Sequence, residues 1–125
     1  MPGENLTHEP DPYVLRDAAE RAIRYRRGIR RRGVAPAAAA IPALAHLGGA
    51  LPERGEPPEG IVALLDEVGS PATTASTGGR YFGFVTGGAL PAAIGASWLA
   101  TAWDQNAALA VMSPVAAEVE RVAIR

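Results

Sequence analysis

The strongest constraint on this chain is a long run, from Tyr81 to Ala117, that contains a single charged residue, Asp104. Charged side chains are almost never fully buried, whereas aromatic side chains are typical of cores and interfaces. A soluble chain keeps charge out of so long a segment only where most of it contacts other protein or a ligand. The run therefore predicts a contact surface. Five of the chain's seven aromatic residues lie in it: Tyr81, Phe82, Phe84, Trp98 and Trp103.

The size and charge of the chain exclude several classes of function. Its 125 residues are enough for one small domain or for a piece of a larger one. The formal net charge of −1 gives no overall attraction to nucleic acid or to an anionic membrane. We therefore expect neither of these as a partner.

The residue types also limit the chemistry. All twelve basic residues are arginine, and the chain contains neither lysine nor cysteine. The lack of cysteine excludes disulfides, thiolate nucleophiles and cysteine metal ligands. His8 and His46 stand far apart without a metal-binding spacing, so no metal site is expected. No serine, threonine or aspartate is spaced as a catalytic triad, and we assign no catalytic residue.

The lack of a recognisable targeting signal favours a cytoplasmic protein. The first residues lack the basic and apolar regions of a secretory signal. The segment from Phe82 to Trp103 is uncharged, but Gly87, Gly88 and Pro91 interrupt it. Its expected helical part, 89–103, is shorter than the roughly 20 residues that cross a bilayer. We therefore predict no membrane span.

Three helices are predicted in an N-terminal arm, residues 11–69, after a disordered lead-in over residues 1–10. The first helix runs from Pro12 to about Arg27, since Asp11-Pro12 combines an N-cap with proline at the first helical position. The second covers about 37–47. The third begins at Pro57-Pro58 and ends at Gly69, with apolar residues at helical spacing. Small polar residues then form a linker over 70–79.

The remaining segment, 80–125, is expected to begin a larger domain and to be truncated. It starts with a short aromatic stretch and a tight turn at Thr86-Gly87-Gly88. A helix over 89–103 is apolar on every side, which predicts burial all round. Ser113-Pro114 then begins a last helix that reaches Arg125 without a stop signal. At most one short strand is expected, too few for a sheet, so the chain is mainly α.

Three features allow two interpretations each. The arginines of Arg24–Arg32 fit a nucleic-acid patch or a solvated helix end, and near-zero net charge favours the second. Gly87-Gly88 fits an anion-binding turn or a close approach of two backbones, and the second is favoured because the phosphate-loop pattern is absent. The corner Asp104-Gln105-Asn106 fits helix caps or ligand contacts, and the sequence does not decide between them.

The residues RYFGFVTGGALPAAIGASWLATAWDQNAALAVMSPVAAEVERVA, Arg80 to Ala123, resemble the N-terminal part of group II pyridoxal-phosphate-dependent amino-acid decarboxylases. This family includes the aromatic-amino-acid and glutamate decarboxylases. Typical members carry H-P-x-F-F, a turn with threonine or serine, an apolar helix, a polar corner, and S-P or A-P before an acidic helix. The resemblance covers roughly residues 11–125. Here the matching positions are Arg80-Tyr81-Phe82, Thr86, Ser113-Pro114, Glu118 and Glu120.

The chain departs from the family pattern at two places. Gly79-Arg80 replaces the histidine-proline pair before the aromatic residues. Positions that contact substrate in some members hold Gly83, Phe84 and Val85 here. These departures leave the identity of the substrate amino acid open.

The resemblance implies that the full protein is an α/β, fold-type-I enzyme that forms a homodimer. The N-terminal helices would wrap the partner subunit, and residues 80–125 would begin the cofactor domain. Phe82, Phe84 and Thr86 would bind the amino-acid substrate. Gln105 and Asn106 would face the neighbouring subunit's cofactor site. The implied cofactor is pyridoxal 5'-phosphate, which supplies an electron sink for loss of the α-carboxylate.

The lack of lysine bears directly on this expectation. Enzymes of this family attach the cofactor through a lysine amine, and this chain contains none. We therefore expect the chain to be the N-terminal part of a decarboxylase, a carbon-carbon lyase, and to be inactive alone. The alternative is a stand-alone helical module that uses the same apolar segment to bind a protein partner.

Overall fold

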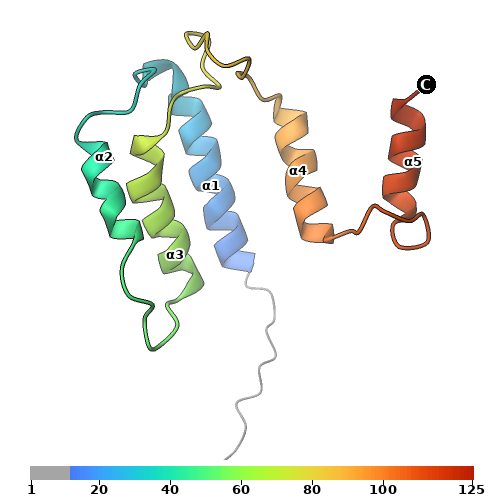
Figure 1. Ribbon diagram of the computed structural model, residues 1–125, viewed down its shortest axis with the longest axis horizontal. Helices are drawn as coiled ribbons and strands as arrows, with labels where there is room; N and C mark the ends of the chain where they lie inside the picture. The colour runs from blue at the N-terminus through green and yellow to red at the C-terminus, as the bar shows by residue number, and fades with distance from the viewer. Residues whose placement is uncertain (1–11) are drawn as a thin grey trace, which may run out of the picture. The chain divides into compact units, whose positions relative to one another are not determined.

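The computed structural model describes residues 12–125, and within that range it contains helices and no strands. The prediction of a mainly α chain is confirmed. The expected disordered lead-in, 1–10, lies outside the described residues. The chain divides into two compact units, one ending at Gly88 and the other running from Ala89 to Arg125. The first unit contains α1 to α3 and the second α4 and α5 (Figure 1).

The first helix of the arm, α1, spans Pro12–Gly28, close to its predicted limits. Arg26 and Arg27 lie in its last turn, where cations interact favourably with the helix dipole. A single 3-10 turn, η1 (Ile29–Arg31), follows, and the backbone becomes extended at Arg32. Segment 75–80 forms hydrogen bonds to the residues at this end of α1.

The second helix is shorter than predicted. Helix α2 spans Ala40–Ala43 and continues as the 3-10 turn η2 (Leu44–Leu47). The sequence predicts a start near Ala37. Pro42 explains the difference, because proline has no N–H to donate and is tolerated only in the first turn of a helix. A start at Ala40 places Pro42 in that turn.

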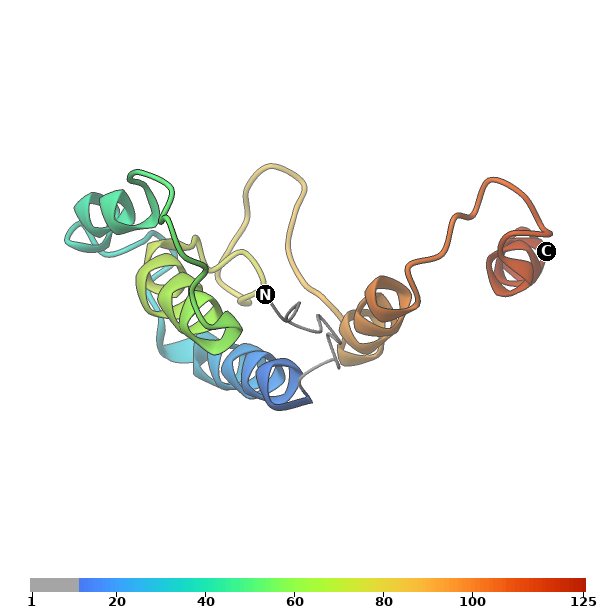
Figure 2. The same ribbon diagram turned by 90° about the horizontal axis from the view of Figure 1, so that it is seen from below.

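The third helix, α3 (Pro58–Leu64), begins with proline at its first turn, as predicted. It continues as a π-helical turn, η3 (Leu65–Gly69), and a 3-10 turn, η4 (Ser70–Ala72). Helices α1 and α3 lie side by side in Figure 1 and Figure 2.

Ion pairs join α1 to the turn after α3. Asp66 accepts from Arg21 at 3.1 Å and from Arg24 at 3.3 Å, and Arg21 also bonds Asp17 at 2.8 Å. The hydrogen bonds that Arg21 donates to Asp17 and, second in effect, to Asp66 raise the pKa of Arg21. Arg24 is thus held within the arm, which agrees with a solvated helix end for this part of the arginine cluster.

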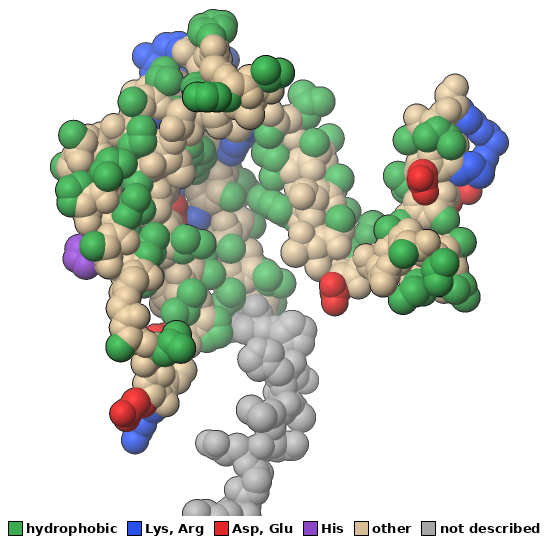
Figure 3. All heavy atoms as spheres, viewed as in Figure 1, with side chains coloured by type: hydrophobic (Ala, Val, Ile, Leu, Met, Phe, Trp, Pro, Cys, Tyr) green, Lys and Arg blue, Asp and Glu red, His purple; other side chains and the backbone are tan. Residues whose placement is uncertain are grey.

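The apolar core is very small. Among residues 12–125 the buried hydrophobic side chains are those of Ala40, 9% exposed, and Ala75, 3% exposed. Many large apolar side chains lie on the surface instead, including Leu51 and Leu90. Hydrophobic side chains are visible over both units in Figure 3.

Helix α4 (Pro91–Trp103) corrects one prediction. Its apolar circumference predicted burial on every side, but none of its residues is buried in the structure. Trp98 remains 45% exposed and Trp103 51% exposed. The reason is that the second unit offers only one further helix, α5, and the two do not pack together along their lengths. No helix within residues 12–125 has both the length and the apolar character needed to cross a membrane.

The last helix, α5 (Pro114–Ala123), begins as predicted. Ser113 is its N-cap, with proline next to it, and the serine hydroxyl accepts a hydrogen bond from the Ala116 N–H at 3.3 Å. Ser113 is 1% exposed, the most buried polar residue of the described chain. The cap therefore satisfies one of the N–H groups that every helix start leaves free.

Removal of this cap should weaken α5. We expect Ser113→Ala to lower the stability of the helix by about 1 kcal/mol, since its first turn loses an acceptor. Circular dichroism and amide exchange at Ala116 measure the effect. Ser97→Ala, on the surface of α4, is the matched control because the Ser97 side chain caps nothing. Equal losses in both variants would contradict the capping role.

Candidate functional site

The aromatic stretch of the first unit forms a tight turn with its apolar side chains outside. The Thr86 N–H donates to the Gly83 carbonyl at 3.2 Å. The two central residues, Phe84 and Val85, have φ of 51° and 53°. Positive φ at both positions is typical of a type I′ turn. We call residues 82–86 the aromatic turn. The predicted turn at Thr86-Gly87-Gly88 thus occurs three residues earlier.

The aromatic turn is strained and fully solvated. A β-branched residue at positive φ is a genuine outlier, and the left-handed conformation costs roughly 1–2 kcal/mol per non-glycine residue. Phe82 is 94% exposed, Phe84 90% and Val85 108%. Strain of this kind gathers at sites of binding and catalysis. The turn therefore displays apolar side chains outward in a conformation that costs energy.

The three residues predicted to bind substrate lie together on this turn. Phe82 and Phe84 are among the most exposed aromatic side chains described. Thr86 Oγ1 lies 3.5 Å from the Gly83 carbonyl oxygen, at the long limit of a hydrogen bond. A bond of this length is weak, and the hydroxyl oxygen can still accept a hydrogen bond from another group. The role in substrate binding itself stays a prediction.

The end of the aromatic turn folds back onto the preceding segment. Gly87 has a φ of 135°, and a Cβ there would lie 3.1 Å from the Ser76 carbonyl oxygen. A Cβ on Gly83 would lie 3.0 Å from the Tyr81 hydroxyl. The favoured interpretation of Gly87, close approach of two backbones, is confirmed.

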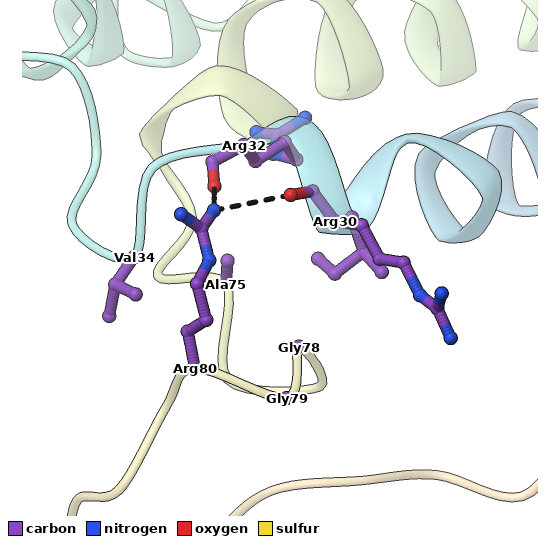
Figure 4. A pocket seen from close by; sticks show the side chains of 8 residues that line it. Arg30, Arg32, Val34, Ala75, Gly78, Gly79 and Arg80 are labelled. Carbon is purple, nitrogen blue, oxygen red and sulfur yellow. Dashed lines mark hydrogen bonds between the residues drawn. The ribbon is translucent and has the colours of Figure 1, made fainter.

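The start of the turn is attached to the end of α1. The Ala75 N–H donates to the Val34 carbonyl at 2.9 Å. Arg80 Nη2 donates to the carbonyl oxygens of Arg30, at 3.3 Å, and of Arg32 (Figure 4). Arg30 lies in the 3-10 turn η1 and Arg32 is the extended residue that follows it, at a helix end where backbone carbonyls lack helical partners. Segment 75–80 is thus held on segment 29–34.

A hollow of about 410 Å³ lies between these two segments. Three arginines line it, but their charges do not converge. Arg80 bonds backbone carbonyls. The Arg32 guanidinium stacks 4.5 Å from the Tyr25 ring centroid and bonds Ser70. The Arg30 side chain extends away from Arg80 in Figure 4. The arrangement therefore lacks the convergent cations that an anion site needs.

The polar corner of the second unit is built from local hydrogen bonds. Asp104 adopts the left-handed conformation that ends α4, with φ 46°. Gln105 Nε2 donates to the Trp103 carbonyl at 2.8 Å, and Asn106 Oδ1 accepts from the Ala108 N–H at 3.0 Å. The capping interpretation therefore accounts for one polar atom of each amide. Both residues are exposed, and their contact with a neighbouring cofactor site stays a prediction.

An ion pair on α5 gives the second unit a pH dependence. Arg121 Nε donates to Glu118 Oε2 at 2.8 Å, and Nη2 bonds the other carboxylate oxygen. This hydrogen bonding lowers the pKa of Glu118 below its ordinary value of 4.5. A lowered folded-state pKa means that the pair stabilises the helix above pH 4.5 and is lost as the pH falls through the folded value.

We expect acidification to reduce the helicity of α5 slightly, because both partners are exposed and the pair is weak. Glu118→Gln should abolish this decrease, whereas Glu120→Gln, the same change on the same helix outside the ion pair, should preserve it. Amide exchange of α5 against pH makes the comparison. An unchanged pH profile in Glu118→Gln would contradict the assignment.

Sequence reasoning missed the anchor at Arg80. An arginine directly before an apolar run carries no local signal for binding two carbonyls some fifty residues earlier, at Arg30 and Arg32. The strain at Val85 was also missed. Valine rarely adopts a positive φ, so nothing in the sequence indicates that conformation there.

Comparison with known proteins adds no assignment to this geometry. No protein-family model matches the chain, and no curated protein or solved structure is significantly similar to it. Among the described residues, no group of three or more histidine, cysteine, aspartate or glutamate side chains is placed to hold a metal ion.

Proposed function

We propose that this chain is the N-terminal part of a pyridoxal-phosphate-dependent amino-acid decarboxylase, a cytoplasmic, homodimeric carbon-carbon lyase. The full protein would be an α/β enzyme of fold type I. In this proposal residues 11–69 supply dimer contacts and residues 80–125 begin the cofactor domain. The basis is the resemblance of Arg80–Ala123 to that family, joined to the exposure that the structure reveals.

The observation that carries the proposal is the open surface of the apolar run. Phe82 and Phe84 are almost fully exposed, and Trp98 and Trp103 about half exposed. Each of the two units thus exposes large apolar side chains, and exposed apolar surface of this kind marks sites that bind protein or ligand. A cofactor-bearing body and a twin subunit would cover this surface. A chain that enclosed the same side chains within its own helices would have had no need of either.

The residues of this chain do not by themselves fit the cofactor. There is no lysine for its attachment, and the arginines around the hollow at 29–34 do not converge on a phosphate. When bound in the full enzyme, the cofactor supplies the electron sink for decarboxylation. Phe82, Phe84 and Thr86 would shape the substrate pocket. Gln105 and Asn106 would approach the neighbouring subunit's site through their exposed amide atoms.

The test uses the protein encoded by the whole reading frame, including anything past Arg125. That protein, supplied with pyridoxal 5'-phosphate and a panel of amino acids, should release carbon dioxide from at least one of them. Borohydride reduction followed by peptide mass analysis should place the attachment lysine outside residues 1–125. Failure to bind the cofactor would overturn the proposal.

The same exposed surface fits the alternative function, a helical module that binds a protein partner. The two proposals differ in what lies beyond Arg125. A reading frame without any cofactor domain, together with capture of a defined protein through α4 and α5, would favour the module. A downstream lysine that forms the cofactor adduct would favour the enzyme.

A further inference from the structure

The aromatic turn is exposed but attached at both ends, and this combination needs an explanation. An exposed loop with few buried contacts is ordinarily among the least stable parts of a protein. Here the segment before the turn is attached to the end of α1, and Gly87 after the turn lies against Ser76. The chain thus exposes the apolar side chains of the turn and holds the preceding segment, 75–80, against the end of α1. We call segment 75–80 the base of the turn.

We propose that Arg80 is the positioning residue that holds the aromatic turn in this orientation. Its guanidinium donates to the carbonyls of Arg30 and Arg32, which are free of helical partners at the end of η1. Hydrogen bonds from a charged donor are about twice as strong as neutral ones. Because Arg80 directly precedes Tyr81, this contact sets the direction in which the turn leaves the arm.

Two neighbouring contacts reinforce the same base. Ala75, 3% exposed, bonds Val34 through its backbone N–H. Gly78 sits so close to Ile29 that an added Cβ would lie 3.4 Å from Ile29 Cγ1. The Tyr81 N–H then donates to the Gly78 carbonyl at 3.2 Å. Arg80 is the side chain that links this base to the turn.

Holding the turn in place has a consequence for binding. A loop already ordered before it meets its ligand loses less conformational freedom on binding, so affinity rises without any new contact. This step rests on the proposed function, in which Phe82, Phe84 and Thr86 meet the amino-acid substrate. Arg80 acts there through these residues and does not touch the substrate.

The first test measures amide hydrogen exchange by NMR in the 125-residue chain, diluted until it no longer self-associates. Arg80→Ala should speed exchange at Tyr81 and Thr86 about tenfold or more and leave the amides of α1 unchanged. Arg80→Lys, which keeps one charged donor, should restore part of the protection. Arg30→Ala is the matched control, because it removes an equal charge beside the same hollow and keeps the carbonyl that Arg80 binds.

Exchange in Arg80→Ala equal to that of the unaltered chain would overturn the proposal, as would an equal effect of Arg30→Ala. A second test uses the intact protein. Arg80→Ala should raise KM about tenfold and leave kcat within about twofold, since a disordered turn weakens binding more than chemistry. An unchanged KM would refute the role in substrate binding. Absence of turnover in the unaltered protein would instead overturn the proposed function, and the exchange result would still decide the role of Arg80 in holding the turn.

Discussion

The isolated chain is expected to self-associate, and Trp98→Ala with Trp103→Ala should weaken that association strongly. Buried tryptophans are frequent centres of binding energy in interfaces, each costing about 2 kcal/mol or more on truncation, or roughly thirtyfold in the dissociation constant. Both tryptophans lie on α4, half exposed and without cover from their own unit. Alanine is the best helix former, so α4 itself should persist in the variant. Analytical ultracentrifugation over a concentration series measures the change.

Leu51→Ala is the matched control for this experiment. Leu51 is 93% exposed and has a large apolar side chain, as Trp98 and Trp103 do, but it lies outside the uncharged run. Its substitution should leave the association unchanged. A monomer that unfolds cooperatively and binds no hydrophobic dye would show that the exposed run needs no cover, and the enzyme-fragment proposal would lose its basis.

The second large effect is expected at Gly87. Gly87→Ala should destabilise the folded-back end of the aromatic turn by about 2–3 kcal/mol, because the φ of 135° is available only to glycine and the new Cβ would press on the Ser76 carbonyl. If the free energy needed to open the turn is smaller than this cost, the turn will open locally. The Thr86 amide should then lose its protection from exchange, whereas the amides of α1 keep theirs.

Substitutions at two other glycines separate the cost of backbone strain from the cost of the steric contact with Ser76. Gly88 has a φ of 84° but open space around it, so Gly88→Ala should cost about 1 kcal/mol from backbone strain alone. Gly55 has open space and no positive φ, so Gly55→Ala should be nearly neutral. The expected order of destabilisation is Gly87, then Gly88, then Gly55. A neutral Gly87→Ala would contradict the close approach to Ser76.

Much of the helical organisation could be predicted because its causes are local. Pro12 and Pro58 begin their helices where the sequence placed them, and Ser113 caps α5. Each signal acts within one turn of backbone, through a fixed φ or a side-chain acceptor. The error at α2 was local too, since Pro42 carries the information that moves the start to Ala40. The predicted boundaries at 69, 79 and 80 describe an intact enzyme and stay predictions.

The candidate site was less predictable because its geometry depends on distant groups. The residues Phe82, Phe84 and Thr86 could be named from the resemblance, and they share one turn. The anchor of that turn, Arg80, could not be identified, since the carbonyls it binds become acceptors only when segment 75–80 meets the end of α1. Likewise, the apolar pattern around the whole of α4 indicates that the helix must pack against other protein. It does not indicate which chain supplies that protein.

The helical class, the proline starts of α1 and α3 and the serine cap of α5 follow from the sequence alone, because caps, proline geometry and side-chain periodicity act between residues close in the chain. The exposure of the uncharged run to solvent and the attachment of the aromatic turn at both ends become apparent only from the folded chain. The physical reason is that burial and long-range hydrogen bonds depend on which surfaces meet. In this chain those surfaces leave two alanines in the core of the described residues and the phenylalanine and tryptophan side chains exposed.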